Sequence, residues 1–242
     1  MNISILQWNT WYKEENQNIV RFLEENPADV ICLQELTVEP NKNNGNLPKY
    51  IAEELGYHYY CKEIDLGDGK INIANGIFSR YPIVASQTKW INEPTGTGHY
   101  DDEYRAYVEV TLDIDGKEVT VATTHMSYTN AFAYTPRKEQ EVKRLIDILH
   151  TKKNSFIFTG DLNATPDSPT IREISGVLHN VGPDFSQNTW TTKPFSYDGF
   201  EETELNWRLD YIFATPDVKT VYAKVINTEY SDHLPVFAEI EL

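Results

Sequence analysis

Residues 155–166, SFIFTGDLNATP, constrain the fold more than any other segment, because a short apolar run ends there abruptly in polar residues. The run FIF shows little alternation between polar and apolar residues, which is typical of a strand covered on both faces. Asp161 and Asn163 follow it, and an extended chain would place both side chains on the same side. Such a pair can bind a hard cation, position a water molecule or hold a phosphoryl oxygen. The alternative is an Asx turn, in which both side chains bond only nearby backbone groups.

The composition favours one acidic globular domain. The chain has 242 residues and no linker, repeat or low-complexity run, so we expect residues 1–242 to form a single domain. With 21 basic and 37 acidic residues the formal net charge is −16, which opposes broad electrostatic capture of duplex DNA. A nucleic-acid substrate is still compatible with this charge, because bound divalent ions or a local basic patch can reverse the potential at one site.

Cysteine usage and the N-terminal sequence indicate the compartment. Cys32 lies in the apolar run VICL, which favours a core residue over a disulfide framework. The N-terminal sequence MNISILQW lacks the charged and apolar parts of a signal peptide, and no later segment approaches the length of a membrane span. We therefore expect a reduced, cytoplasmic compartment and no membrane partner. We also expect the protein to be a monomer.

The first 35 residues predict a βαβ-like unit. Residues 3–8 form a strand that ends at Asn9, residues 17–25 carry apolar side chains at helical spacing, and residues 29–33, DVICL, form a second buried strand that ends before Glu35. This order places Asn9 and Glu35 at the same end of neighbouring strands. An acid directly after so apolar a run is unusual for a surface position. The alternative for Glu35 is a solvated loop acid.

A predicted hairpin delivers a histidine to a strand end. Its strands cover residues 104–112 and 117–124, with Asp-Gly at the turn, and His125 follows the second strand. His125 can donate to a phosphoryl oxygen or orient a ligand, and the alternative is a core histidine with satisfied hydrogen bonds. The clearest helix is expected over residues 136–150, which lead into the FIF strand.

Two acids and a histidine lie near the C-terminus. Residues 206–213, NWRLDYIF, place Asp210 inside an aromatic and aliphatic strand, where an unpaired charge would be costly. Residues 230–237, YSDHLPVF, then present Asp232 and His233 together. If Asp210 lies on a neighbouring strand, one imidazole nitrogen can bond to a carboxylate while the other acts as a base. The alternative for Asp232 and His233 is a capped turn.

Two long polar segments, residues 91–102 and 190–204, are predicted to be irregular loops, the first a binding loop and the second a loop over the site. Aromatic side chains in and beside them can stack on bases or sugar rings, or they can simply pack the loops. These aromatic residues are Trp90, Tyr100, Trp190, Phe195 and Tyr197.

Seven motifs follow one another along nearly the whole chain: QWNTW, LQEL, RAYVEV, TTHMS, GDLNATPDS, RLDYIF and SDHLPV. Each is weak alone, but together and in this order they resemble the endonuclease/exonuclease/phosphatase superfamily, which has the deoxyribonuclease I-like fold. The resemblance implies a four-layer α/β sandwich, in which two packed mixed β-sheets are flanked by helices. It also implies metal-dependent hydrolysis of a phosphate ester.

The resemblance further implies a metal site and a catalytic group. Glu35 would be the principal ligand of a Mg²⁺ ion, supported by Asn9 and Asp232. Mn²⁺ is an alternative ion. Asp161 would orient or deprotonate the attacking water, and His233, held by Asp210, would act as base or stabilise the transition state. Members of the superfamily differ in which residue is the base, so Asp161 and His233 are both candidates.

Three more residues are expected to contact the phosphate: Asn163, His125 and Arg105. Some nucleases of the superfamily pair the histidine of the TH motif with an acid near the NGIFSR position, where this chain has Asn75. An amide can orient an imidazole but cannot stabilise its charged form. We therefore expect His125 to act as a neutral donor.

The first hypothesis is a Mg²⁺-dependent phosphoesterase that acts on a small phosphorylated molecule or on a nucleic-acid end. The alternative is a DNA repair nuclease or phosphodiesterase, similar to apurinic endonucleases or to tyrosyl-DNA phosphodiesterase, although the sequence has no basic helix or Lys/Arg cluster that would follow a duplex backbone. A third hypothesis is a non-catalytic regulator with the same fold. Loss of metal or histidine positions would favour it, and all of them are filled here.

Overall fold

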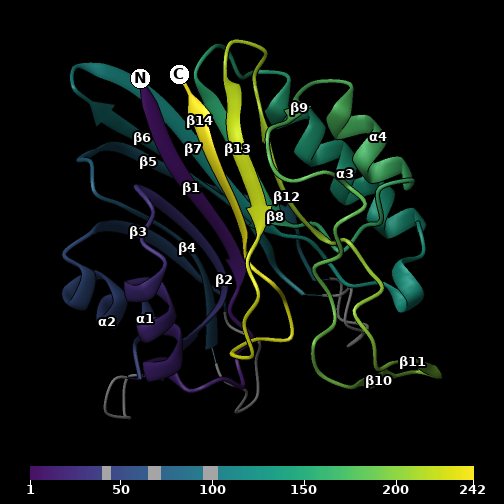
Figure 1. The fold of residues 1–242 in the computed structure, drawn as a ribbon. Coiled ribbons are helices and arrows are strands. Elements are labelled where there is room, and N and C mark those ends of the chain that lie inside the picture. The colour runs from purple at the N-terminus through teal and green to yellow at the C-terminus, as the bar shows by residue number, and fades with distance from the viewer. Residues whose placement is uncertain (40–44, 65–71, 95–102) are drawn as a thin grey trace.

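The structure is a computed structural model that describes residues 1–39, 45–64, 72–94 and 103–242. Two six-stranded mixed β-sheets pack face to face, and helices cover their outer faces (Figure 1). One apolar core lies between the two sheets. A further core lies between the first sheet and its helices, and another between the second sheet and its helices. The expected four-layer α/β sandwich is therefore confirmed.

The first sheet has the strand order β13-β14-β1-β2-β4-β3. Its strands are β13 (Lys219–Val225), β14 (Val236–Glu241), β1 (Asn2–Asn9), β2 (Val30–Val38), β4 (Asn72–Ser79) and β3 (His58–Ile64). Helices α1 (Asn16–Glu25) and α2 (Leu47–Leu55) lie on its outer face.

The second sheet has the order β5-β6-β7-β8-β12-β9. Its strands are β5 (Ile83–Asn92), β6 (Arg105–Ile114), β7 (Lys117–His125), β8 (Phe156–Asp161), β12 (Asp210–Ala214) and β9 (His179–Asn180). Helices α3 (Pro136–Leu149) and α4 (Pro169–Ser175) cover it, and a turn of 3₁₀ helix, η1, spans Asn130–Phe132. In the described part of the chain, no helix combines the length and the apolar character that crossing a membrane requires.

Strand pairing brings the predicted site residues to one end of the sandwich. β1 and β2 are parallel, with Asn9 opposite Gln34. β7 and β8 are also parallel, with His125 opposite Asp161. β12 runs antiparallel to β8 and begins at Asp210, which lies opposite Asp161. Parallel neighbours end at the same edge of a sheet, so each sheet contributes polar residues to one place.

The prediction that the second strand ends before Glu35 was wrong. β2 continues to Val38, and its pairing with β4 shifts register between Leu33 and Leu36. Glu35 lies in this irregularity with φ = 57°, in the left-handed region that non-glycine residues seldom adopt. A bulge re-aims a side chain within a strand. Here the Glu35 carboxylate meets the side chain of Asn9 on β1.

Several predicted elements are confirmed with small changes in their ends. The hairpin with Asp-Gly at its turn is formed by β6 and β7, and the helix predicted from residue 136 is α3. The strand predicted over residues 206–213 begins only at Asp210, because the preceding chain turns to pair Trp207 with Trp190. Most of the predicted loop 91–102 lies outside the described residues.

We expected residues 190–204 to be irregular, but part of this segment forms regular structure. β10 (Phe195–Tyr197) and β11 (Phe200–Glu202) form a hairpin around a two-residue turn. Both turn residues, Asp198 and Gly199, have positive φ, which a type I′ turn requires and which Asp-Gly favours. The Asp-Gly pair therefore carried a hairpin signal within an otherwise polar and aromatic segment.

Gly160 precedes Asp161 on β8, where any side chain would collide with β7. A Cβ atom at this position would lie 2.3 Å from the backbone oxygen of Thr124. We expect Gly160→Ala to lower the free energy of unfolding by about 1–3 kcal/mol, measured by urea denaturation. Gly182→Ala is the control, since its added Cβ would meet its nearest neighbour at an ordinary 3.4 Å. Equal stability of the two variants would contradict this prediction.

Candidate active site

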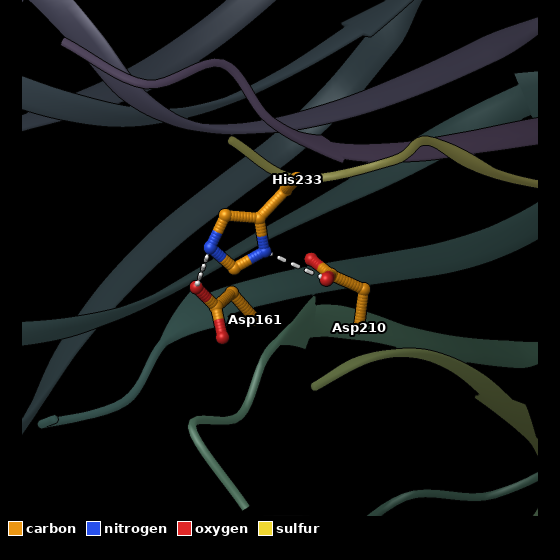
Figure 2. A group of neighbouring side chains, drawn as sticks. All are labelled: Asp161, Asp210 and His233. Carbon is orange, nitrogen blue, oxygen red and sulfur yellow. Dashed lines mark hydrogen bonds and ion pairs between the residues drawn. The ribbon is translucent and has the colours of Figure 1, made fainter. Parts of the chain in front are cut away.

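His233 lies between two carboxylates that come from the second sheet (Figure 2). Its Nδ1 is 2.8 Å from Oδ2 of Asp210, and its Nε2 is 3.5 Å from Oδ2 of Asp161. All three side chains are buried. Burial alone would lower the pKa of His233, but the charges of Asp210, Asp161 and Asp232 raise it well above its usual value. The surroundings therefore favour an imidazolium with a proton on each nitrogen.

A pair of glutamines, Gln7 on β1 and Gln34 on β2, supports Asp210 from the first sheet. Nε2 of Gln7 donates to Oδ1 of Asp210 at 3.2 Å. The two amides also donate to each other, at 2.6 and 2.9 Å, and Gln34 donates to Thr123 Oγ1 on β7. These side chains are fully buried, so the hydrogen bonds fix the orientation of Asp210 in a region without competing solvent.

Asn9 joins Glu35 to Asp161 across the gap between the sheets. Its Nδ2 donates to Oε1 of Glu35 at 3.1 Å and to Oδ2 of Asp161 at 2.9 Å. Its Oδ1 accepts from the backbone N–H of Trp11, and the backbone N–H of Tyr12 donates to Oε2 of Glu35. In this orientation Asn9 holds two carboxylates in place, and its carbonyl oxygen faces the backbone.

Asp232 and Glu35 form an acidic pair on which the charge of His233 acts from one side. Burial and the charge of Glu35 raise the pKa of Asp232 to about 6, and burial also raises the pKa of Glu35. Asp232 accepts a hydrogen bond from Nε1 of Trp190 at 3.3 Å. Among the described residues, neither acid forms an ion pair with a lysine or arginine. Half-buried carboxylate oxygens that form no ion pair with a lysine or arginine are a donor set that suits a hard divalent cation.

Asp161, Asp210 and His233 are a second group whose ligand atoms lie close enough together for a metal, within 4.8 Å of one another. Both nitrogens of His233 already face carboxylates in this group. A cation there would have to replace a proton that the two carboxylates stabilise. Glu35 and Asp232 lack such a shared proton and fit a metal ion better.

His125 contacts the same oxygen of the Asp161 carboxylate as His233 does. Its Nε2 lies 3.4 Å from Oδ2 of Asp161 and 3.1 Å from Nδ2 of Asn163. Burial and the nearby charges of Arg105, His233 and Lys138 lower the pKa of His125 well below its usual value. The histidine is therefore neutral.

Asn163 does not extend the strand, contrary to the alternation that we assumed for it. It has φ = 44°, and its backbone N–H donates to Oδ1 of Asp161, which is the Asx turn considered as the alternative. Its side chain is nevertheless part of the site, because Nδ2 donates to the carbonyl of Met126 at 2.9 Å and faces His125. The turn and the site contact therefore occur together.

The remaining predicted positions also lie near this centre. Arg105 is buried and pairs with Glu103 at 2.8 Å, and its charge acts on His125. Asn75 does not bond to His125, since its amide donates to the backbone of Ala106 at 3.3 Å. Asn75 therefore does not replace the acid found in some nucleases.

The aromatic residues of the loop beside the site are packed together. Trp190 and Phe195 lie 5.1 Å apart, ring centre to ring centre, in a cluster with Phe132 and Leu209. In this segment the packing alternative describes the structure. Tyr100 lies outside the described residues.

Three residues with close contacts to the site were missed from the sequence: Gln7, Gln34 and Lys138. The glutamines occupy positions in apolar strands, and a buried amide there is a signal for a polar network. Lys138 falls on the same helix face as Val142 and Leu145, where a charge is unexpected.

Removal of the Asp210 charge should be visible at His233. We expect Asp210→Asn to lower the pKa of His233, because the carboxylate that raises it is replaced by a neutral amide. The measurement is an NMR titration of the His233 ring signals, assigned with a His233→Gln variant. Asp113→Asn, on the hairpin far from the ring in sequence and pairing, is the control. An unchanged titration in Asp210→Asn would contradict the pairing.

The chain matches the model of the Endonuclease/Exonuclease/phosphatase family over residues 6–233. No protein with curated annotation matches it in sequence. A solved endonuclease/exonuclease/phosphatase family protein from Leptotrichia buccalis superposes with a TM-score of 0.75 and 23% identity, covering 99% of this chain and 100% of the other.

Two further solved structures share the fold at lower identity. The mannosyl-6-phosphatase of Bacteroides thetaiotaomicron has a TM-score of 0.70 and 18% identity, covering 99% of this chain and 100% of its own. TDP2 of D. rerio, complexed with a single strand DNA product, has a TM-score of 0.68 and 18% identity, covering 100% of this chain and 99% of its own. At these identities the superpositions establish the shared fold.

Proposed function

From the premise that the chain belongs to the endonuclease/exonuclease/phosphatase family, whose members are generally hydrolases of phosphate esters, we propose that it is a divalent-metal-dependent phosphoesterase. It would hydrolyse a phosphodiester or a phosphomonoester by in-line attack of an activated water. The observation that carries the proposal is the half-buried acidic pair Glu35 and Asp232, directly beside the Asp161–His233–Asp210 group.

Glu35 and Asp232 would hold the metal, with Asn9 fixing Glu35 in the orientation seen here or joining the ligands after its amide rotates. When bound, Mg²⁺ or Mn²⁺ would polarise a phosphoryl oxygen and neutralise negative charge at the reaction centre. The chemistry of the donor set supports this assignment, because all the donors are oxygen atoms.

We assign the role of base to Asp161 and that of charge stabiliser to His233. Both ring nitrogens of His233 face carboxylates, so each carries a proton and the ring is a donor. Burial and the charge of Asp210 raise the pKa of Asp161 to about 6, against the lowering effect of His233. A carboxylate with this pKa is ionised at neutral pH and basic enough to accept a proton from water.

His125 and Asn163 would bind the phosphate together with Arg105. Nδ2 of Asn163 donates to the Met126 carbonyl, which can only accept, so this contact fixes the amide. The same nitrogen faces Nε2 of His125, which must then accept, and the proton of the neutral ring lies on Nδ1. Nδ1 lies 3.9 Å from Oε1 of Glu35 and is available to donate to a phosphoryl oxygen.

The substrate class that we favour is a small phosphorylated molecule or a nucleic-acid end. The net charge of −16 disfavours a polynucleotide backbone as the main source of affinity. The fold is shared by a mannosyl-6-phosphatase and by TDP2 bound to single strand DNA product, so it accommodates both kinds of substrate. A DNA repair nuclease or phosphodiesterase is the second candidate, and a high diester-to-monoester ratio would favour it.

Hydrolysis of two chromogenic esters tests the proposed reaction. With Mg²⁺ or Mn²⁺ we expect turnover of bis-p-nitrophenyl phosphate or p-nitrophenyl phosphate, and no turnover in EDTA. Glu35→Ala, His233→Ala and Asp161→Asn should each lower kcat by about 10²–10⁴-fold, because each removes a group that acts on the reacting atoms. His150→Ala, at an exposed position that ends helix α3, is the control. Turnover that survives in EDTA would exclude the metal-dependent mechanism.

Metal binding can be tested without substrate. Mg²⁺ or Mn²⁺ at 100 times its dissociation constant should stabilise the folded protein by about 2.7 kcal/mol, because it binds the folded state alone. Differential scanning calorimetry should show this as a rise in Tm for the wild type and for Glu24→Gln, an exposed glutamate on α1. Glu35→Gln should abolish the rise. An equal rise in Glu35→Gln would place the metal elsewhere.

A further inference from the structure

Lys138 is a buried cation whose ammonium group bonds to two loops at the site. It lies on helix α3 and is only 2% exposed. Its Nζ donates to the carbonyl oxygen of Ser127 at 2.8 Å and to that of Leu162 at 2.9 Å. A lysine so deeply buried is uncommon without hydrogen-bonded partners, and here both partners are backbone atoms.

The two carbonyls belong to the loops that carry the proposed phosphate-binding groups. Ser127 follows His125 by two residues in the loop after β7, and Leu162 separates Asp161 from Asn163 in the loop after β8. The same loops are linked by the backbone hydrogen bond from Met126 N to Asp161 O at 2.9 Å. Lys138 therefore adds a side-chain link between two loops that already touch.

Glu141, one turn further along α3, completes the attachment. Its Oε1 accepts from the backbone N–H of Ser127 at 3.0 Å. Lys138 thus binds the backbone carbonyl of Ser127, and Glu141 binds the backbone N–H of the same residue. Burial and the charge of Arg105 lower the pKa of Lys138, whereas Glu141 and Asp161 raise it, and the result is about 8. The lysine is still mostly protonated at neutral pH.

An apolar side chain would suit this helix face better on packing alone. Val142 and Leu145 on the same face are fully buried, and an ammonium group beside them loses its hydration. An apolar residue would, however, leave the carbonyls of Ser127 and Leu162 without this donor, and buried unpaired carbonyls are costly. The contacts therefore suit a lysine that holds two chain segments together.

We propose that Lys138 is a positioning residue that fixes the loop after β7 against the loop after β8, and thereby sets His125 and Asn163 relative to Asp161. Lys138 does not itself touch the reacting atoms. Its part in catalysis rests on the proposed function, whereas its part in ordering the loops does not. Misplacement of reacting groups by about 1 Å can cost roughly 100-fold in rate.

The test compares Lys138→Met and Lys138→Ala with Lys143→Ala, a control at an exposed position of the same helix. Lys138→Met keeps the length of the side chain and removes only its donor and charge, so it also serves if the alanine variant fails to fold. We expect both Lys138 variants to lose roughly 10- to 100-fold in kcat/KM for the chromogenic ester that the wild type hydrolyses. Lys143→Ala should remain near the wild type. Propylammonium added to Lys138→Ala should restore part of the loss, which a general loss of packing would not allow.

Hydrogen–deuterium exchange gives a measurement that needs neither metal nor substrate. Residues 126–129 and 162–164 should exchange faster in Lys138→Met, while the centres of β7 and β8 keep their protection. If kcat/KM and loop exchange both match the wild type, the proposal is wrong. If exchange rises throughout the protein and the amine restores nothing, Lys138 only stabilises the fold and the proposal is also wrong. If the wild type hydrolyses neither ester but the two loops still exchange faster, the proposed function fails and the ordering role of Lys138 stands.

Discussion

The site depends on how the protein tolerates several buried and half-buried carboxylates in one place. Four carboxylates gather around the imidazole of His233: Asp161, Asp210, Asp232 and Glu35. The neutral imidazole of His125 also lies beside Asp161 and Glu35. Burial and mutual repulsion raise the pKa values of Asp161, Asp232 and Glu35, so ionisation of these three groups is costly. His233 bonds to Asp210 and faces Asp161, and its charge also acts on Glu35 and Asp232, but among the described residues neither member of that pair forms an ion pair with a lysine or arginine. A bound cation would relieve that repulsion, which links the architecture of the site to its proposed metal requirement.

The fold brings these charges together through paired strands and a polar layer between the sheets. β1 and β2 end together in the first sheet, and β7 and β8 end together in the second. Behind the charged groups, Gln7 and Gln34 reach from the first sheet to Asp210 and Thr123 in the second. Such a buried network is stabilising only when every group is satisfied, so it also specifies how the sheets are aligned. The orientation of His233 is therefore a consequence of sheet packing.

Much of this was predictable from the chain, and the failures have local physical causes. Apolar runs ending in polar residues located the strands that lead to Asn9 and Asp161, and an acid inside an apolar strand, Asp210, indicated the partner of the His233 imidazole. Strand periodicity could not reveal the bulge at Glu35, because the left-handed backbone there is imposed by pairing with β4. Nor could it show the turn at Asn163. The role of Lys138 could not be predicted for another reason. Its partners are backbone carbonyls, which every residue type has, so nothing in the sequence identifies them.

The two sheets contribute groups of opposite charge to the site, which explains how so acidic a protein could bind a phosphate ester. Glu35 belongs to the first sheet and Asp232 precedes its strand β14, whereas the buried cations Arg105 and Lys138 belong to the second sheet and its helix. The proposed metal ligands and the phosphate-binding groups thus come from different sheets and meet where the two sheets adjoin, which we call the seam. His233 crosses this seam, because it precedes a strand of the first sheet but bonds to carboxylates of the second. An overall charge of −16 repels an anion at long range, yet the local field at the seam is set by these few buried groups. Affinity should therefore depend on the phosphate at the seam, which suits a substrate recognised by one phosphoryl group.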